Sequence, residues 1–168
     1  SRLIKPVKNY YDYRLAIAES SNQTILQTLL NKKVTTVTNS ENAQSVPVVV
    51  YHGIVEEADG RNATLEQIKE QLYGLHTAGY KTVSLEDYLL FTQGQKELPE
   101  KSFLLTFDDG RKDSLKTDPI LKALNYQAVM FVITSKIGSS EYYLSMSELK
   151  SMQKSNRWNI QSHSHNAH

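Results

Sequence analysis

Two short stretches concentrate the side chains that bind metal ions and transfer protons. The first is TFDDG (106–110), in which Asp108 and Asp109 directly follow an apolar run. The second is SHSHNAH (162–168), which holds three of the five histidines in the chain. Carboxylate and imidazole are ligands of catalytic zinc, which keeps three protein ligands and leaves one position for water. One aspartate and two histidines would satisfy this count.

Each stretch also has a simpler interpretation. Asp-Gly is a common turn pair, and a terminal histidine cluster is typical of a solvated tail. However, both stretches follow runs that read as strands, SFLLTF and RWNIQS. The carboxyl ends of parallel strands lie at one edge of a sheet, where α/β proteins carry their chemistry. Together, the two stretches therefore favour a single metal site.

The roles within this site follow only in part from spacing. Side chains alternate along a strand, so Asp108 and Asp109 would point in different directions. One could then bind a metal ion while the other accepts a proton. His163 is expected at the end of its strand, and either His165 or His168 could be the second imidazole ligand.

The elements that must position these residues alternate along the chain. Strands are predicted within 46–54, 81–85, 102–107, 127–134 and 157–162, and helices within 64–80, 85–93, 116–124 and 145–155. Such alternation indicates right-handed βαβ units and a parallel sheet. The run VPVVVYHGI is apolar and β-branched, which predicts a first strand buried on both faces. An open sheet between helices and a barrel inside a helical ring both remain possible at this point.

The composition sets the remaining limits. A chain of 168 residues favours one main domain, and a net charge of +1 gives no general attraction to nucleic acid. The absence of cysteine excludes thiol catalysis and disulfides. Residues 1–45 are rich in Asn, Gln, Ser and Thr, which predicts a polar stalk or a small accessory element. The main domain is expected to span 46–168.

The stretch from Val46 to His168 resembles the NodB-homology polysaccharide deacetylases, carbohydrate esterase family four. TFDDG is similar to the first motif of that family, and HSHNAH is similar to its second. The family's usual sequence also contains, in the same order, segments similar to VPVVVYHGI, LPEKSFLLTFDDG and WNIQSH. The longer histidine spacing resembles the branch that includes poly-N-acetylglucosamine deacetylases. The resemblance implies an α/β fold, the N-terminal part of a distorted (β/α) barrel with seven to eight strands when complete. The remainder of the catalytic domain, with its general acid and oxyanion donor, is then expected outside this chain.

The resemblance also implies a role for each site residue. Asp108 matches the general base of the family. Asp109, His163 and His168 match the ligands of one divalent metal ion, with zinc as the first candidate. His165 falls in a variable position of the motif and is expected to be a neighbour only.

Other residues near the predicted site remain open. Arg111 stands where the family more often has an aromatic residue or proline, so it could alter the substrate groove. His52 could line the same groove or serve only in packing. Tyr142 and Tyr143 lie in a loop before a predicted helix, where stacking on sugar rings and half-buried packing are equally compatible with the sequence.

The function implied is metal-dependent hydrolysis of N-acetyl groups from an N-acetylglucosamine polysaccharide, either peptidoglycan or exopolysaccharide, with release of acetate. The partners implied are this polymer and the remainder of the catalytic domain, without nucleic acid. The location implied is extracytoplasmic, in a bacterial protein that is secreted or tethered to membrane or cell wall. Two alternatives are a non-catalytic carbohydrate-binding derivative of the same fold and a metal-dependent phosphoester hydrolase, which would need more carboxylates at the same edge.

Overall fold

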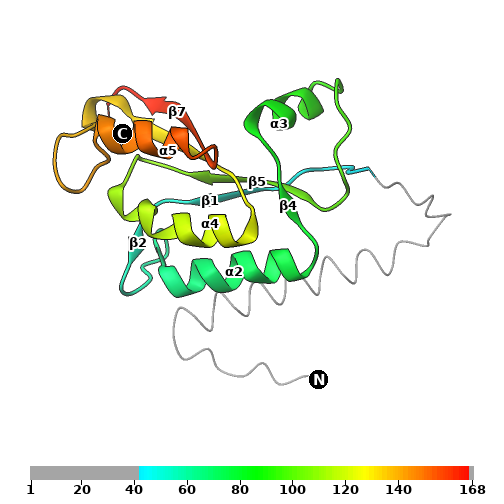
Figure 1. Cartoon of the computed structure of the whole chain (residues 1–168), viewed down its shortest axis with the longest axis horizontal. Helices are drawn as coiled ribbons and strands as arrows, with labels where there is room; N and C mark the ends of the chain where they lie inside the picture. The colour runs from blue at the N-terminus through cyan, green and yellow to red at the C-terminus, as the bar shows by residue number, and fades with distance from the viewer. Residues whose placement is uncertain (1–41, 167–168) are drawn as a thin grey trace, which may run out of the picture. The chain divides into compact units, whose positions relative to one another are not determined.

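The computed structural model describes residues 42–166 (Figure 1). Of the predicted extension, only its last four residues, 42–45, are therefore described. Asn42 forms an antiparallel bridge with Pro99, and the Ala43 N–H donates a hydrogen bond to the Leu98 carbonyl at 2.7 Å. The boundary between extension and domain remains a prediction.

A five-stranded sheet forms the centre of the described structure. Its strands are β1 (Val48–Tyr51), β4 (Lys81–Thr82), β5 (Ser102–Phe107), β6 (Ala128–Ile133) and β7 (Trp158–Ser164). The order is β1-β5-β6-β7, with β4 also paired to β5, and every pairing is parallel. These five strands correspond to the five predicted from the sequence, so the predicted parallel sheet is confirmed. Two short strands, β2 (Ile54–Val55) and β3 (Ala63–Thr64), pair separately.

The prediction of one strand over 46–54, buried on both faces, was wrong. The chain leaves the sheet after β1 because the Gly53 N–H bonds the Asn62 side chain and β2 pairs with β3 instead of β5. Val48 and Val50 are 43% and 47% exposed. The reason is that β1 pairs on one side only, and the described part of the chain leaves the face with these two valines uncovered.

Within residues 42–166, four helices flank the sheet, with two short 3₁₀ segments between elements. They are α2 (Leu65–Thr77), α3 (Leu85–Thr92), α4 (Asp118–Leu124) and α5 (Met146–Lys154), with η1 (Lys112–Thr117) and η2 (Thr134–Lys136). The sequence has capping-box spacing at Thr64 with Gln67 and at Ser145 with Glu148, and both boxes form at the starts of α2 and α5. Pro119 lies in the first turn of α4, where its missing N–H costs no helical hydrogen bond.

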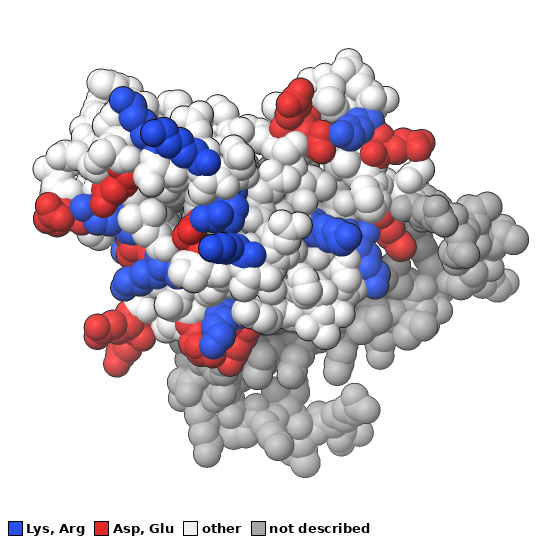
Figure 2. Space-filling view, in the orientation of Figure 1, with Lys and Arg blue, Asp and Glu red and all other residues white. Residues whose placement is uncertain are grey.

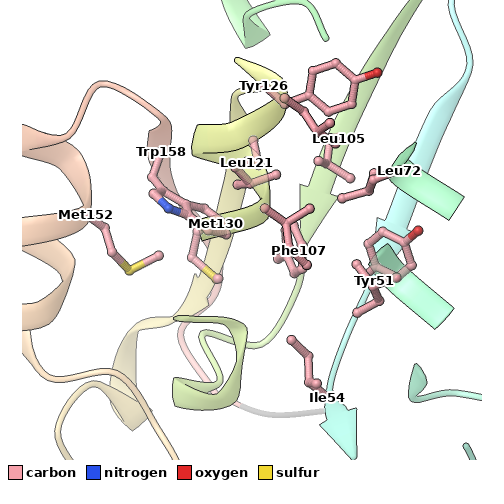
Figure 3. Packing of buried hydrophobic residues seen from close by; sticks show 14 of the residues in the cluster. Tyr51, Ile54, Leu72, Leu105, Phe107, Leu121, Tyr126, Met130, Met152 and Trp158 are labelled. Atoms are coloured by element: carbon pink, nitrogen blue, oxygen red, sulfur yellow. The ribbon is translucent and has the colours of Figure 1, made fainter. Parts of the chain in front are cut away.

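Alternation along β5 divides the core between the two faces of the sheet. Phe103, Leu105 and Phe107 face the larger cluster, which includes residues of α2, α4 and α5. Leu104 faces a smaller cluster against which α3 packs. Figure 3 shows Phe107 of β5 packed with residues of β6, β7 and α4, and its ring centroid lies 5.2 Å from that of Trp158. Helices α2, α4 and α5 therefore cover one face, α3 covers part of the other, and β5 is buried throughout.

The outer surface shows no dominant charge on the face in view. Lys and Arg side chains are interspersed with Asp and Glu across that face (Figure 2).

Figure 1 also shows α2 and α4 running side by side along the sheet. Across residues 42–166, no helix combines the length and the apolar character needed to span a membrane.

Candidate metal centre and active site

The turn after β5 carries the two adjacent aspartates. The Asp108 N–H donates to the Tyr51 carbonyl at 2.9 Å, which continues the β1–β5 pairing by one residue. Asp109 then adopts a φ of 69° and Gly110 a φ of 68°. The left-handed conformation is unfavourable for a residue with a Cβ, so the surroundings must hold Asp109 in place. A Cβ on Gly110 would lie 3.1 Å from Val132 Cγ1, so the turn passes directly against β6.

This crossing brings the second aspartate to the neighbouring histidine strand. Because β6 lies between β5 and β7, a side chain from β5 meets β7 only if the chain crosses the end of β6. Asp109 Oδ1 lies 3.7 Å from Nε2 of His163, near the carboxyl end of β7. Their side chains are 19% and 27% exposed, so both are accessible from solvent yet held by the fold. Two of the predicted ligands, far apart in sequence, are thus adjacent.

The spacing of this pair suits a shared metal ion. Two ligands that each lie about 2.1 Å from one zinc ion are at most about 4.2 Å apart. The 3.7 Å between Asp109 Oδ1 and His163 Nε2 falls within that limit. Within residues 42–166 no group of three potential ligands occurs, and His168 lies outside the described residues. Nδ1 of His165 lies 3.1 Å from the Thr134 hydroxyl, a contact with η2.

The first aspartate faces a different histidine. Asp108 Oδ2 lies 3.8 Å from Nε2 of His52, the residue that follows β1. Burial raises the pKa of the Asp108 carboxyl, while the neighbouring His163 and His52 act in the opposite direction. A raised pKa makes a carboxylate a stronger proton acceptor, which suits a general base. Asp108 and Asp109 thus have separate partners at one edge of the sheet.

Sequence reasoning missed one residue of this edge. Arg61, in the loop between β2 and β3, places Nη2 3.4 Å from Asp109 Oδ2, and its side chain is 67% exposed. It therefore supplies a positive charge beside a predicted metal ligand. The local sequence ADGRN indicates a turn, but nothing in it identifies which carboxylate the arginine meets.

Arg111 is held inside the loops that surround the site. Its side chain is 11% exposed, and both Nε and Nη2 donate to Asp113 Oδ2, at 3.1 and 2.5 Å. Nη1 donates to Asn62 Oδ1 at 3.1 Å, the oxygen that also accepts the Gly53 N–H. The guanidinium lies 4.4 Å from the ring centroid of Tyr142. Arg111 thus joins three loops at this edge of the sheet.

Comparison with known proteins identifies this arrangement of strands and site. A sequence model of the polysaccharide deacetylase family matches residues 95–168, which include both aspartates and the histidine-rich stretch. Residues 95–168 thus match the polysaccharide deacetylase family, and the predicted resemblance is confirmed.

Particular relatives agree with this assignment. The poly-beta-1,6-N-acetyl-D-glucosamine N-deacetylase of Staphylococcus epidermidis is 28% identical over 120 residues, which are 67% of this chain and 40% of that protein. The solved structure of a de-N-acetylase from Aggregatibacter actinomycetemcomitans superposes with a TM-score of 0.63 at 26% identity, over 70% of this chain and 54% of the other. IcaB from Ammonifex degensii shares the fold, with a TM-score of 0.64 at 24% identity over 70% and 52%. The chain thus spans about 40% of the length of the curated relatives it matches.

Proposed function

We propose that the full-length protein hydrolyses the N-acetyl groups of an N-acetylglucosamine polysaccharide and releases acetate, using one divalent metal ion. The observation that carries the proposal is the 3.7 Å approach of Asp109 Oδ1 to His163 Nε2, with Asp108 beside them, in a NodB-type domain. Poly-β-1,6-N-acetylglucosamine is the first substrate to test, since the staphylococcal relative is named for it.

The metal ligands in this proposal are Asp109, His163 and His168. All are oxygen or nitrogen donors, and zinc is the first candidate among the divalent ions that such ligands bind. A bound divalent ion would polarise the acetamide carbonyl and lower the pKa of a bound water molecule toward about 7.

The protein's own residues divide the remaining work. Asp108 accepts the proton of the attacking water, because it lies beside the metal ligands and its pKa is raised by burial. His52 lies beside that carboxylate, with Nε2 3.8 Å from Asp108 Oδ2. The C–N bond then breaks, acetate forms, and the amine leaves with a proton from a general acid.

Two substitutions separate the roles of the aspartates. In the full-length protein, Asp109→Ala should lose both bound zinc and acetate release, because it removes a ligand. Asp108→Asn should keep zinc but lose about 100- to 10,000-fold in kcat, because it removes the base. Asp87→Ala on α3 is the matched control for loss of a carboxylate and should change neither.

Acetate release and zinc content are measured together for each variant. Undiminished acetate release by Asp109→Ala would contradict the assignment. Polymer binding without acetate release by the wild-type protein would instead favour a carbohydrate-binding derivative of the fold. Parallel assays with poly-β-1,6-N-acetylglucosamine, peptidoglycan and chitin oligomers identify the polymer.

The proposal includes an extracytoplasmic location, because bacterial cell-wall and exopolysaccharide polymers lie outside the cytoplasmic membrane. Cell fractionation of the native host tests it, and recovery of the protein with the cytoplasmic fraction alone would contradict this part of the proposal.

A further inference from the structure

One exposed aromatic side chain near the site has no role in the proposed mechanism. Tyr142 is 50% exposed, which is more than most large apolar and aromatic residues of the described structure. It lies in the loop between η2 and α5, a segment that has no regular pairing of its own. A half-exposed aromatic ring offers an apolar face on which a ligand can pack.

The backbone fixes this loop against the residues that follow the aspartate pair. The Lys112 N–H donates to the Tyr142 carbonyl at 3.0 Å, and the Leu144 N–H donates to the Gly110 carbonyl at 2.9 Å. Between these two bonds, Arg111 and Tyr143 form an antiparallel bridge. The loop is thus fixed against residues 110–112, which begin one residue after Asp109.

The ring itself is held from two directions. The Arg111 guanidinium lies 4.4 Å from its centroid, a cation–π distance. The ring of Tyr143 lies 4.9 Å away at an interplanar angle of 77°. The Arg111 charge is paired with Asp113, so it acts here as a fixed support and leaves no free cation for an anionic ligand.

We propose that Tyr142, held by Arg111, is a stacking platform for a sugar ring of the polymer next to the ring that reacts. This inference rests on the proposed function and names a residue that binds the substrate. A pyranose ring presents a face of C–H groups that packs against an aromatic face. A preset ring loses little conformational freedom when the sugar binds, which favours affinity. Arg111 Nη1 also donates to Asn62 Oδ1, so the guanidinium that supports the ring is itself fixed.

The experiment compares KM and kcat for acetate release by the full-length zinc-loaded protein. With a pentamer of β-1,6-linked N-acetylglucosamine, Tyr142→Ala should raise KM about 2- to 10-fold and leave kcat nearly unchanged. Tyr142→Phe should behave like the wild type, because the ring face is retained. With single N-acetylglucosamine as the substrate, Tyr142→Ala should have no effect. Tyr73→Ala, which removes a tyrosine 43% exposed on α2, is the matched control and should leave both constants unchanged.

Binding measured without turnover separates this inference from the proposed function. Pentamer affinity is measured by calorimetry for Asp108→Asn and for the same protein with Tyr142→Ala added. A 2- to 10-fold weaker affinity, about the range expected for one aromatic contact, supports the platform. This result would support it even if the wild-type protein released no acetate. Equal affinities would overturn it, even if acetate release is normal. Equal losses in the Phe and Ala variants would also overturn it, because they would assign the effect to the hydroxyl.

The supporting role of Arg111 is tested by a double substitution. Arg111→Lys keeps the charge but loses the planar group that lies on the ring, so it should also raise the KM for the pentamer. In the Tyr142→Ala protein the same change should add nothing, because its effect passes through the ring. If the double variant instead raises the KM for the pentamer by the product of the two single factors, Arg111 does not act through Tyr142. That result would overturn this part of the inference.

Discussion

The tight turn after the aspartate pair allows a quantitative test of how the fold places Asp109. In Gly110→Ala, the new Cβ would lie 3.1 Å from Val132 Cγ1 and 3.2 Å from Val132 Cβ. Val132 is 5% exposed and belongs to a central strand, so it cannot move away freely. The φ of 68° costs an alanine about 1–2 kcal/mol, and crowding of this kind costs about 1–3 kcal/mol more. The expected loss is therefore about 2–5 kcal/mol of unfolding free energy.

A second glycine separates the two contributions. Gly94 has the same φ of 68°, but nothing lies within 4 Å of the position that its Cβ would take. Gly94→Ala should therefore lose only the conformational part, about 1–2 kcal/mol. Urea unfolding of both variants measures the difference. Gly110→Ala should also weaken zinc binding, because it shifts Asp109 relative to His163, whereas Gly94→Ala should not.

Equal losses of unfolding free energy in the two variants would refute this reasoning. They would show that Val132 accommodates the added methyl group and that the crossing of β6 is not tightly packed. Val132→Ala in the Gly110→Ala protein is the confirming variant. The loss of unfolding free energy caused by Val132→Ala should be smaller in the Gly110→Ala protein than in the wild type, because the substitution removes the crowded methyl groups.

Three further predictions address two ion pairs and one helix cap. Hydrogen bonds from Arg157 lower the pKa of Asp118, so this pair stabilises the fold above about pH 4. The stabilisation is lost as pH falls through the lowered pKa of Asp118. The difference in urea stability between the wild type and Asp118→Asn should therefore close below about pH 4. Ser145→Ala should cost about 1 kcal/mol in urea unfolding, because it removes the cap of α5. Arg61→Gln should tighten zinc binding by up to about 5-fold in a chelator competition, because it removes a cation beside Asp109.

Each of these predictions has a contradicting result. A gap for Asp118→Asn that stays constant from pH 7 to pH 3 would show that the carboxylate charge does not matter. Unchanged stability of Ser145→Ala would mean that α5 is fixed by packing alone. Lys69→Gln, on α2, is the control for loss of an exposed cation, and an equal change in zinc affinity there would indicate a general charge effect rather than one from Arg61.

Local patterns in the sequence predicted the elements of the fold well. The five strands of the main sheet were predicted because strand periodicity is a property of a few neighbouring residues. The capping boxes and the place of Pro119 in the first turn of α4 depend on equally short stretches. The run 46–54 was misjudged because a β-branched apolar segment reads as one buried strand. The break at Gly53 arises from Asn62, nine residues away, and the exposure of Val48 and Val50 arises from the position of β1 at the edge of the described sheet.

The sequence by itself determined which side chains could bind a metal ion and which strand ends would carry them, because residue type and strand periodicity are local properties. Only the tertiary structure decided how these side chains meet. Asp109 approaches His163 because a left-handed turn crosses β6, and Arg61 approaches Asp109 across 48 positions of sequence. Arg111, which the sequence suggested as a groove residue, lies against Tyr142 and Asp113. Contacts of this kind depend on how distant segments pack, and no local pattern encodes them.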